Sequence, residues 1–158
     1  MGTASGGPRD LGGDGLAIVA RARSCWGHAG RGRENIHGTR VEEDPRLLDY
    51  LTEKKIPLEM CPLSNVRTGV VGSIDEHPIR RYYQRELVVT VNTDDPKMFG
   101  NSLAEEYRLL ETRLGFSREE IRGLILQGIQ ASWLSQDRKQ QLCQEFCKDA
   151  TWQLIEKR

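Results

Sequence analysis

One stretch of this sequence constrains the fold most: a run of β-favouring residues, Val88 to Val91, leads into Asp94, Asp95 and Pro96. Pro96 has no backbone N–H to donate to a neighbouring strand, so a strand here has to end before it. Strands that deliver acidic side chains at their carboxyl ends are typical of active-site loops in parallel α/β folds. The stretch therefore predicts a buried strand followed by a functional loop. A solvated Asp-Pro turn after an ordinary strand is the alternative.

The two adjacent carboxylates repel each other, and such repulsion is usually relieved by water, a cation or a retained proton. A nearby histidine could be a general base, a metal ligand or an electrostatic helper. His37 is the candidate for this role, because it follows an expected strand end, although a plain turn is the alternative. His77 is expected to be an exposed cap at the start of a helix. The segment from Cys61 to Asn65 is expected to have no more than a minor lining role.

Expected helices and strands alternate from Glu34 onward. Strands are expected at residues 56–61 and 88–92, with a third just before His37, and helices at 45–55, from 78, at 103–114, from 117 and from 135. Residues 62–65 are expected to be a loop. Repeated units of this kind imply parallel strands with right-handed crossovers, and the lack of strict alternation predicts burial on both faces. Three strands are too few for a closed eight-stranded barrel, which needs about 250 residues.

Residues 1–33 differ from the rest of the chain, because they are rich in glycine and arginine and lack a periodic apolar pattern. Only residues 16–22 could form a short helix or strand there. We expect this irregular segment to be disordered, and residues 34–158 to form one domain.

Charge and cysteine content argue against several classes of function. The 158 residues carry 23 basic and 23 acidic side chains, so no basic surface indicates a nucleic-acid partner. No apolar run reaches the length of about 18 residues that a membrane span needs, and the start of the chain lacks the features of a signal peptide. The four cysteines form neither a Cys-x-x-Cys pair nor a spaced disulfide framework, which predicts a reduced, cytoplasmic setting.

Three motifs stand in the order and approximate spacing of one known family. They are IHGTRVEEDP at 36–45, PLEMCPLSNV at 57–66 and VNTDDP at 91–96, and Phe99-Gly100 and Glu105-Glu106-Tyr107 extend the match. Together they resemble the zinc-dependent adenosine and adenine deaminases over roughly residues 33–156. The resemblance implies an α/β fold that is an incomplete (β/α)8 TIM barrel, with about the last three β/α units plus the C-terminal helices.

The resemblance also implies a chemistry. In this family a catalytic Zn²⁺ activates a water that attacks C6 of the purine, and ammonia leaves. By resemblance Asp94 is the zinc ligand and orients the water, Asp95 binds the purine at N7, and His37 acts catalytically beside the hydroxide. The implied function is hydrolytic deamination of adenosine to inosine, with a small-molecule purine as the binding partner and adenine deamination as the alternative.

The sequence departs from the family in its histidines. The family takes its other zinc ligands from a His-x-His pair, which is missing here, and from a His-Ala-Gly-Glu motif, where this sequence reads His28-Ala-Gly-Arg31. A catalytic zinc site needs about three protein ligands, so we expect the chain alone to be inactive. We interpret it as the C-terminal part of a barrel whose segment before Glu34 is altered. A catalytically dead remnant that acts as an interaction module is a further alternative, and exposed barrel edges would favour its self-association.

Overall fold

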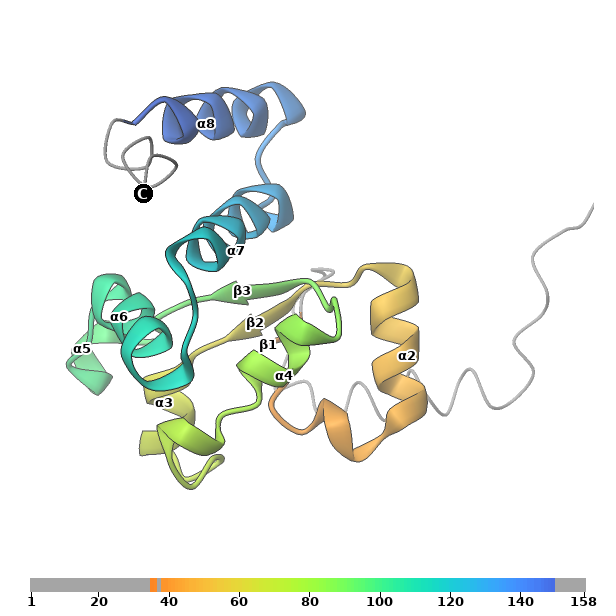
Figure 1. Cartoon of the computed structure of the whole chain (residues 1–158), viewed down its shortest axis with the longest axis vertical. Coiled ribbons are helices and arrows are strands. Elements are labelled where there is room, and N and C mark those ends of the chain that lie inside the picture. Colours follow the sequence, from red (N-terminus) through yellow and green to blue (C-terminus); the bar gives the residue numbers. More distant parts are fainter. Residues whose placement is uncertain (1–34, 37, 150–158) are drawn as a thin grey trace, which may run out of the picture.

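The computed structural model describes residues 35–36 and 38–149, which form a small parallel sheet with helices packed against one face and at its ends (Figure 1). The strands are β1 (Asn35–Ile36), β2 (Leu58–Met60) and β3 (Val89–Val91), and they lie in the order β1-β2-β3. Both pairings are parallel, with Leu58 opposite Val89 and Met60 opposite Val91. The three expected strands and their parallel arrangement are confirmed. The expected disordered segment at 1–33 lies outside the described residues.

Helices connect the strands and continue after β3. The connection from β1 to β2 contains η1 (Val41–Glu43) and α2 (Pro45–Lys54), and that from β2 to β3 contains α3 (Pro62–Arg67), η2 (Ile74–Glu76) and α4 (Ile79–Gln84). After β3 come α5 (Pro96–Phe99), α6 (Leu103–Leu114), α7 (Arg118–Ala131) and α8 (Gln136–Lys148). Within the described ranges, none of the helices is both long enough and apolar enough to cross a membrane.

Local sequence signals set several helix ends. Ser117 and Glu120 form the expected capping box at the start of α7, and Gly115 ends α6 with a φ of 65°. The expected loop at residues 62–65 is wrong, because these residues begin α3. Pro62 stands at the first helical position, where its missing N–H is one that the helix would leave unpaired anyway.

The core lies on one face of the sheet. Leu58, Met60 and Val89 are buried there against apolar side chains from the surrounding helices. Those side chains include Val41, Leu47, Leu51, Ile79, Tyr82, Leu110 and Leu124. The alternate positions Glu59 and Thr90 fall on the other face and are only half-buried. The expectation of burial on both faces is therefore wrong for the described part of the chain.

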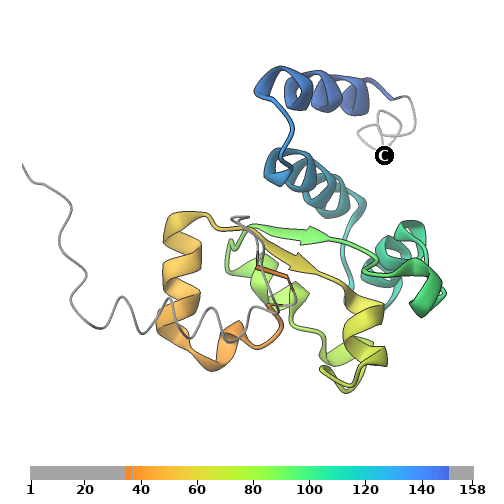
Figure 2. The ribbon, with the colours of Figure 1, turned by 180° about the vertical axis from the view of Figure 1, so that it is seen from behind.

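The carboxyl ends of the strands define where a site can form. Figure 2 shows β2 and β3 running toward α3, α5 and α6, with α2 near the opposite end of the sheet. Helix α7 packs along β3. The segments that follow β2 and β3 therefore lie together, at the end of the sheet where parallel α/β proteins bind their ligands.

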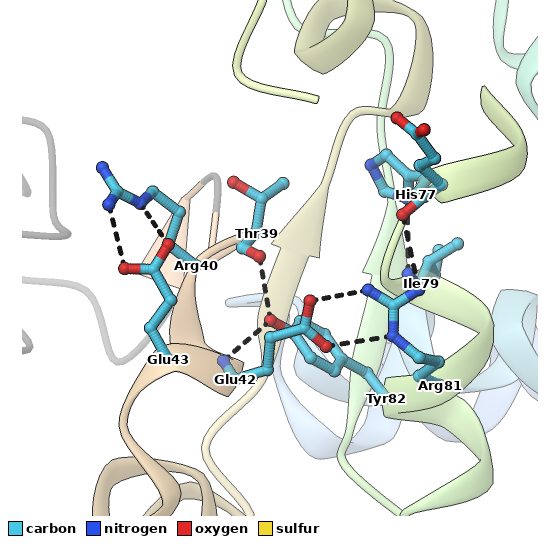
Figure 3. Close-up of polar contacts among 9 residues, drawn as sticks. Thr39, Arg40, Glu42, Glu43, His77, Ile79, Arg81 and Tyr82 are labelled. Carbon is cyan, nitrogen blue, oxygen red and sulfur yellow. Dashed lines mark hydrogen bonds and ion pairs between the residues drawn. The ribbon is translucent and has the colours of Figure 1, made fainter. Parts of the chain in front are cut away.

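Tyr82 ties α4 to the turn after β1. Its hydroxyl accepts from the N–H of Glu42 at 3.1 Å and donates to the carbonyl of Thr39 at 3.0 Å (Figure 3).

We expect Tyr82→Phe to lower the free energy of unfolding by about 1–3 kcal/mol, because both backbone groups lose the hydroxyl as their partner. Chemical denaturation measures the change. The control, Tyr83→Phe, keeps its edge-on ring contact with Phe116, and an equal loss in both variants would contradict the assignment.

Candidate active site

The segments that follow β2 and β3, which are α3 and the loop at residues 92–95, bring two polar side chains together. Ser64 on α3 donates from Oγ to Oδ2 of Asp94 at 2.7 Å, although 30 residues separate them in the sequence. The parallel pairing of β2 with β3 explains this contact, because the carboxyl ends of neighbouring parallel strands lie at the same edge of a sheet. The contact holds the Asp94 carboxylate in a defined position beside α3.

The two adjacent aspartates point to different partners. Asp94 has a left-handed backbone, with a φ of 59°, which Asp and Asn adopt more readily than other non-glycine residues. Asp95 caps α5, where its Oδ1 accepts from the N–H of Lys97 at 3.0 Å and of Met98 at 2.9 Å. Each carboxylate therefore has hydrogen-bond donors of its own, which offset the repulsion expected between them.

Both aspartates are exposed in the described part of the chain. An enzyme pocket normally buries about 70–90% of the surface of a small ligand. Two shallow grooves lie elsewhere: one of about 350 Å³ between α7 and α8, and one of about 400 Å³ near the amino ends of β2 and β3. Among the described residues, the two aspartates therefore lie at an open surface and outside both of these grooves.

The described residues do not fit a zinc ion on their own. Across 35–36 and 38–149, no three His, Cys, Asp or Glu side chains form a group that could hold a metal. A catalytic zinc uses about three protein ligands. Of the ligands that such a site would need, the described residues supply Asp94 but no neighbouring group that could complete the set. His37 lies outside the described residues. The roles predicted for His37, Asp94 and Asp95 therefore stay predictions.

Cys61 precedes α3 but does not supply a reactive thiol. Burial raises the pKa of this thiol to about 12, and the negative charges of Glu59, Asp94 and Glu106 add to the effect. Because the thiolate is the form that attacks electrophiles and binds metals, Cys61 is inert at neutral pH.

His77 is buried, with 1% of its surface exposed, so its expected exposure is wrong, although its ring does accept from the first residue of α4 as a cap would. Its Nδ1 accepts from the N–H of Ile79 at 3.3 Å, and its Nε2 lies 3.0 Å from Oδ1 of Asn65 (Figure 3 shows the ring). Since Nδ1 is the acceptor, Nε2 carries the proton and donates to Asn65. Burial lowers the pKa of His77 to about 4, and the charge of Arg81 adds to the effect. A neutral His77 therefore anchors α3, the helix that carries Ser64.

Sequence reasoning missed two parts of this arrangement. The segment from Cys61 to Asn65 contains Ser64, but nothing in the sequence pairs its hydroxyl with Asp94. Glu106 is fully buried beneath α3 and the loop after β3, although a glutamate in a helix is usually a surface residue. Its place in the Glu105-Glu106-Tyr107 match to the family was the signal that could have singled it out.

Comparison with known sequences gives a consistent family. The adenosine deaminase family profile matches residues 33–149. An aminodeoxyfutalosine deaminase of Streptomyces coelicolor is 41% identical over 110 residues, which are 70% of this chain and 28% of the relative. An adenine deaminase of Wolinella succinogenes is 44% identical over 103 residues (65% and 31%), and an adenosine deaminase of Klebsiella pneumoniae is 38% identical over 118 residues (74% and 35%). The chain spans about a third of the length of these relatives.

Solved structures agree with the sequence comparison. The adenine deaminase of Arthrobacter aurescens superposes with a TM-score of 0.69 at 35% identity, over 72% of this chain and 35% of that protein. The N6-methyl-AMP deaminase of Arabidopsis thaliana gives a TM-score of 0.72 at 27% identity, over 87% and 38%. An amidohydrolase of Burkholderia ambifaria with bound zinc shares the fold, with a TM-score of 0.63 at 23% identity, over 71% and 32%.

The family profile covers well over half of the chain, and the matched residues include both α3 and the loop after β3. The chain therefore belongs to the adenosine deaminase family.

Proposed function

We propose that this chain supplies the carboxylate side of a purine deaminase site. The observation that carries the proposal is the hydrogen bond between Ser64 and Asp94, which fixes a carboxylate at the carboxyl end of a parallel sheet. In this proposal Asp94 is a zinc ligand, Asp95 contacts the purine ring and His37 acts beside them. The support comes from the family, whose matched relatives include deaminases of adenine and of adenosine.

The three strands are, in this proposal, the last strands of a (β/α)8 barrel. Two findings support it: each connection between the parallel strands contains helices, and the chain spans about a third of its relatives. Both β1 and β3 are edge strands of the described sheet, where a closed barrel would continue on either side. The missing metal ligands and pocket walls would then come from polypeptide outside the described residues.

Adenosine is the first candidate substrate, because the matching family profile is that of adenosine deaminase. Adenine is the second, and a specific observation favours it: the Wolinella succinogenes adenine deaminase is 44% identical to this chain, against 38% for the Klebsiella pneumoniae adenosine deaminase. Both substrates present the same 6-aminopurine to the aspartates, and they differ in the ribose.

A chimera tests the proposal. The 103-residue matched segment of the Wolinella succinogenes adenine deaminase is replaced by the corresponding residues of this chain. Zinc is supplied, and turnover of adenine and of adenosine is followed by the ultraviolet absorbance of the aminopurine and by ammonia release. We expect turnover of at least one purine, because the segment carries both Asp94 and Asp95.

The design separates a functional segment from a catalytically dead remnant. A chimera that folds and binds zinc but turns over neither purine contradicts the proposal and favours the interaction module. Size-exclusion chromatography of the 158-residue chain then checks that alternative, which predicts self-association.

A further inference from the structure

Glu106 connects α3 and the loop after β3, the two segments of the candidate site, through buried hydrogen bonds. It lies on α6 and is fully buried, and its Oε2 accepts from the N–H of Leu63 at 3.1 Å. Its Oε1 accepts from Nδ2 of Asn101 at 2.6 Å. Burial raises the pKa of this carboxyl, whereas the donors Leu63 and Asn101 oppose the rise. Burying a carboxyl group costs free energy, and the hydrogen bonds from the two N–H groups offset this cost. This arrangement indicates that Glu106 has a specific structural role.

Asn101 extends the connection to the loop after β3. The same Nδ2 donates to the backbone carbonyl of Thr93 at 3.1 Å, directly before Asp94. This fixes the orientation of the amide, because the reversed amide would place its oxygen against two acceptors. Asn101 Oδ1 is buried and lacks a hydrogen-bond partner among the described residues, so the amide is held by its nitrogen.

We propose that Glu106 is a positioning residue that locks α3, the helix directly after β2, to the loop after β3 and thereby holds Ser64 Oγ against Asp94. Leu63 adjoins Ser64, and Thr93 adjoins Asp94, so the path through Glu106 and Asn101 spans the same gap as the Ser64–Asp94 hydrogen bond. A consequence for catalysis rests on the proposed function, but the coupling of α3 to the loop after β3 does not.

Glu106→Gln tests this coupling with almost no change of shape. A carboxylate accepts at both oxygens, whereas a glutamine amide accepts at one end and donates at the other. Either orientation sets an NH₂ group against the N–H of Leu63 or against Nδ2 of Asn101. One of the two hydrogen bonds is therefore lost. The control is Glu105→Gln, since Glu105 is the exposed neighbour on α6 and accepts from the hydroxyl of Ser102.

The first measurement is NMR of the full 158-residue chain. In Glu106→Gln we expect changed resonances for the Leu63 N–H and the Asn101 side-chain amide. The one of these two groups that loses its acceptor should exchange its hydrogen with solvent about tenfold faster. The Overhauser contact between Ser64 and Asp94 should be lost. The Tyr82 backbone amide in the core should keep its protection. Glu105→Gln should match the parent chain.

A second variant covers the case in which Glu106→Gln fails to fold. Asn101→Ala cuts the path at the Thr93 end and keeps the bond from Leu63 to Glu106. Besides the two hydrogen bonds of the Asn101 amide itself, it should lose the Ser64–Asp94 contact, while the Leu63 N–H should exchange at the parent rate. A Ser64–Asp94 contact that survives in either folded variant, or protection that falls equally in the core, overturns the proposal.

The second measurement is turnover by the chimera carrying Glu106→Gln. We expect kcat to fall about ten- to a hundredfold with KM within about threefold, because a displaced carboxylate affects the reacting geometry more than purine binding. An unchanged kcat overturns the positioning role. If the parent chimera is inactive, the proposed function fails and the NMR result alone decides the role of Glu106.

Discussion

Asp94→Asn in the chimera is expected to lower kcat/KM by about a thousandfold or more. Asparagine keeps the size of the side chain, can still accept from Ser64, and tolerates the left-handed backbone at this position. The variant therefore removes the negative charge with little effect on the fold. Steady-state turnover of the better purine measures the loss, and circular dichroism confirms that the variant is folded.

The matched control is Asp75→Asn. Asp75 is an exposed carboxylate on η2 that pairs with Arg113, in the last turn of α6, at 2.7 Å. Exposed ion pairs contribute only about 0–1 kcal/mol to the free energy of unfolding, so the Asp75→Asn variant should stay folded. We therefore expect its kcat/KM to stay within about twofold of that of the parent chimera. If Asp94→Asn retains activity comparable to this control, Asp94 is not the carboxylate on which the reaction depends.

The second large effect is a loss of stability in acid that depends on His77. The pKa of this imidazole falls from its ordinary value of 6.5 to about 4 in the fold. Between these values the unfolded chain binds the proton and the folded chain does not, so stability rises with pH. The contribution of neutral His77 is fully present above pH 6.5 and is lost as the pH falls toward 4. The difference between the two pKa values corresponds to about 3 kcal/mol in the free energy of unfolding.

Denaturation at pH 7 and pH 4 measures this contribution, with His77→Gln as the variant that cannot titrate there. We expect the parent chain to lose about 3 kcal/mol more than the variant between the two pH values. An NMR titration of the parent gives an independent reading, in which one of the three histidines should titrate near pH 4. Equal acid sensitivity in both proteins would show that His77 is not held neutral.

The strands and most helices follow from local patterns that the sequence contains. The β-favouring run before Asp94 and the capping box at Ser117 act within a few residues, so the expected elements match. Helix α3 was missed because six residues are too few to show a helical period. Burial on both faces of β2 and β3 was expected but is not found. The reason is that the burial of a strand face depends on which other elements cover it, and the strand's own sequence does not determine this.

The contacts of the site depend on distance in space rather than in sequence. Ser64 meets Asp94 across 30 residues, and Leu63 meets Glu106 across 43. No local pattern encodes such pairings. His77 shows the same limit, since a polar residue beside a proline suggests an exposed turn, yet here the ring is buried and bonded to Asn65.

The most direct test compares the 158-residue chain with the chimera in one deaminase assay, with zinc supplied to both. The described residues hold a fixed carboxylate but not a complete metal site, so we expect no turnover by the chain alone and purine turnover by the chimera that disappears with Asp94→Asn. Robust turnover by the isolated chain, or a folded chimera indifferent to Asp94, would contradict this account.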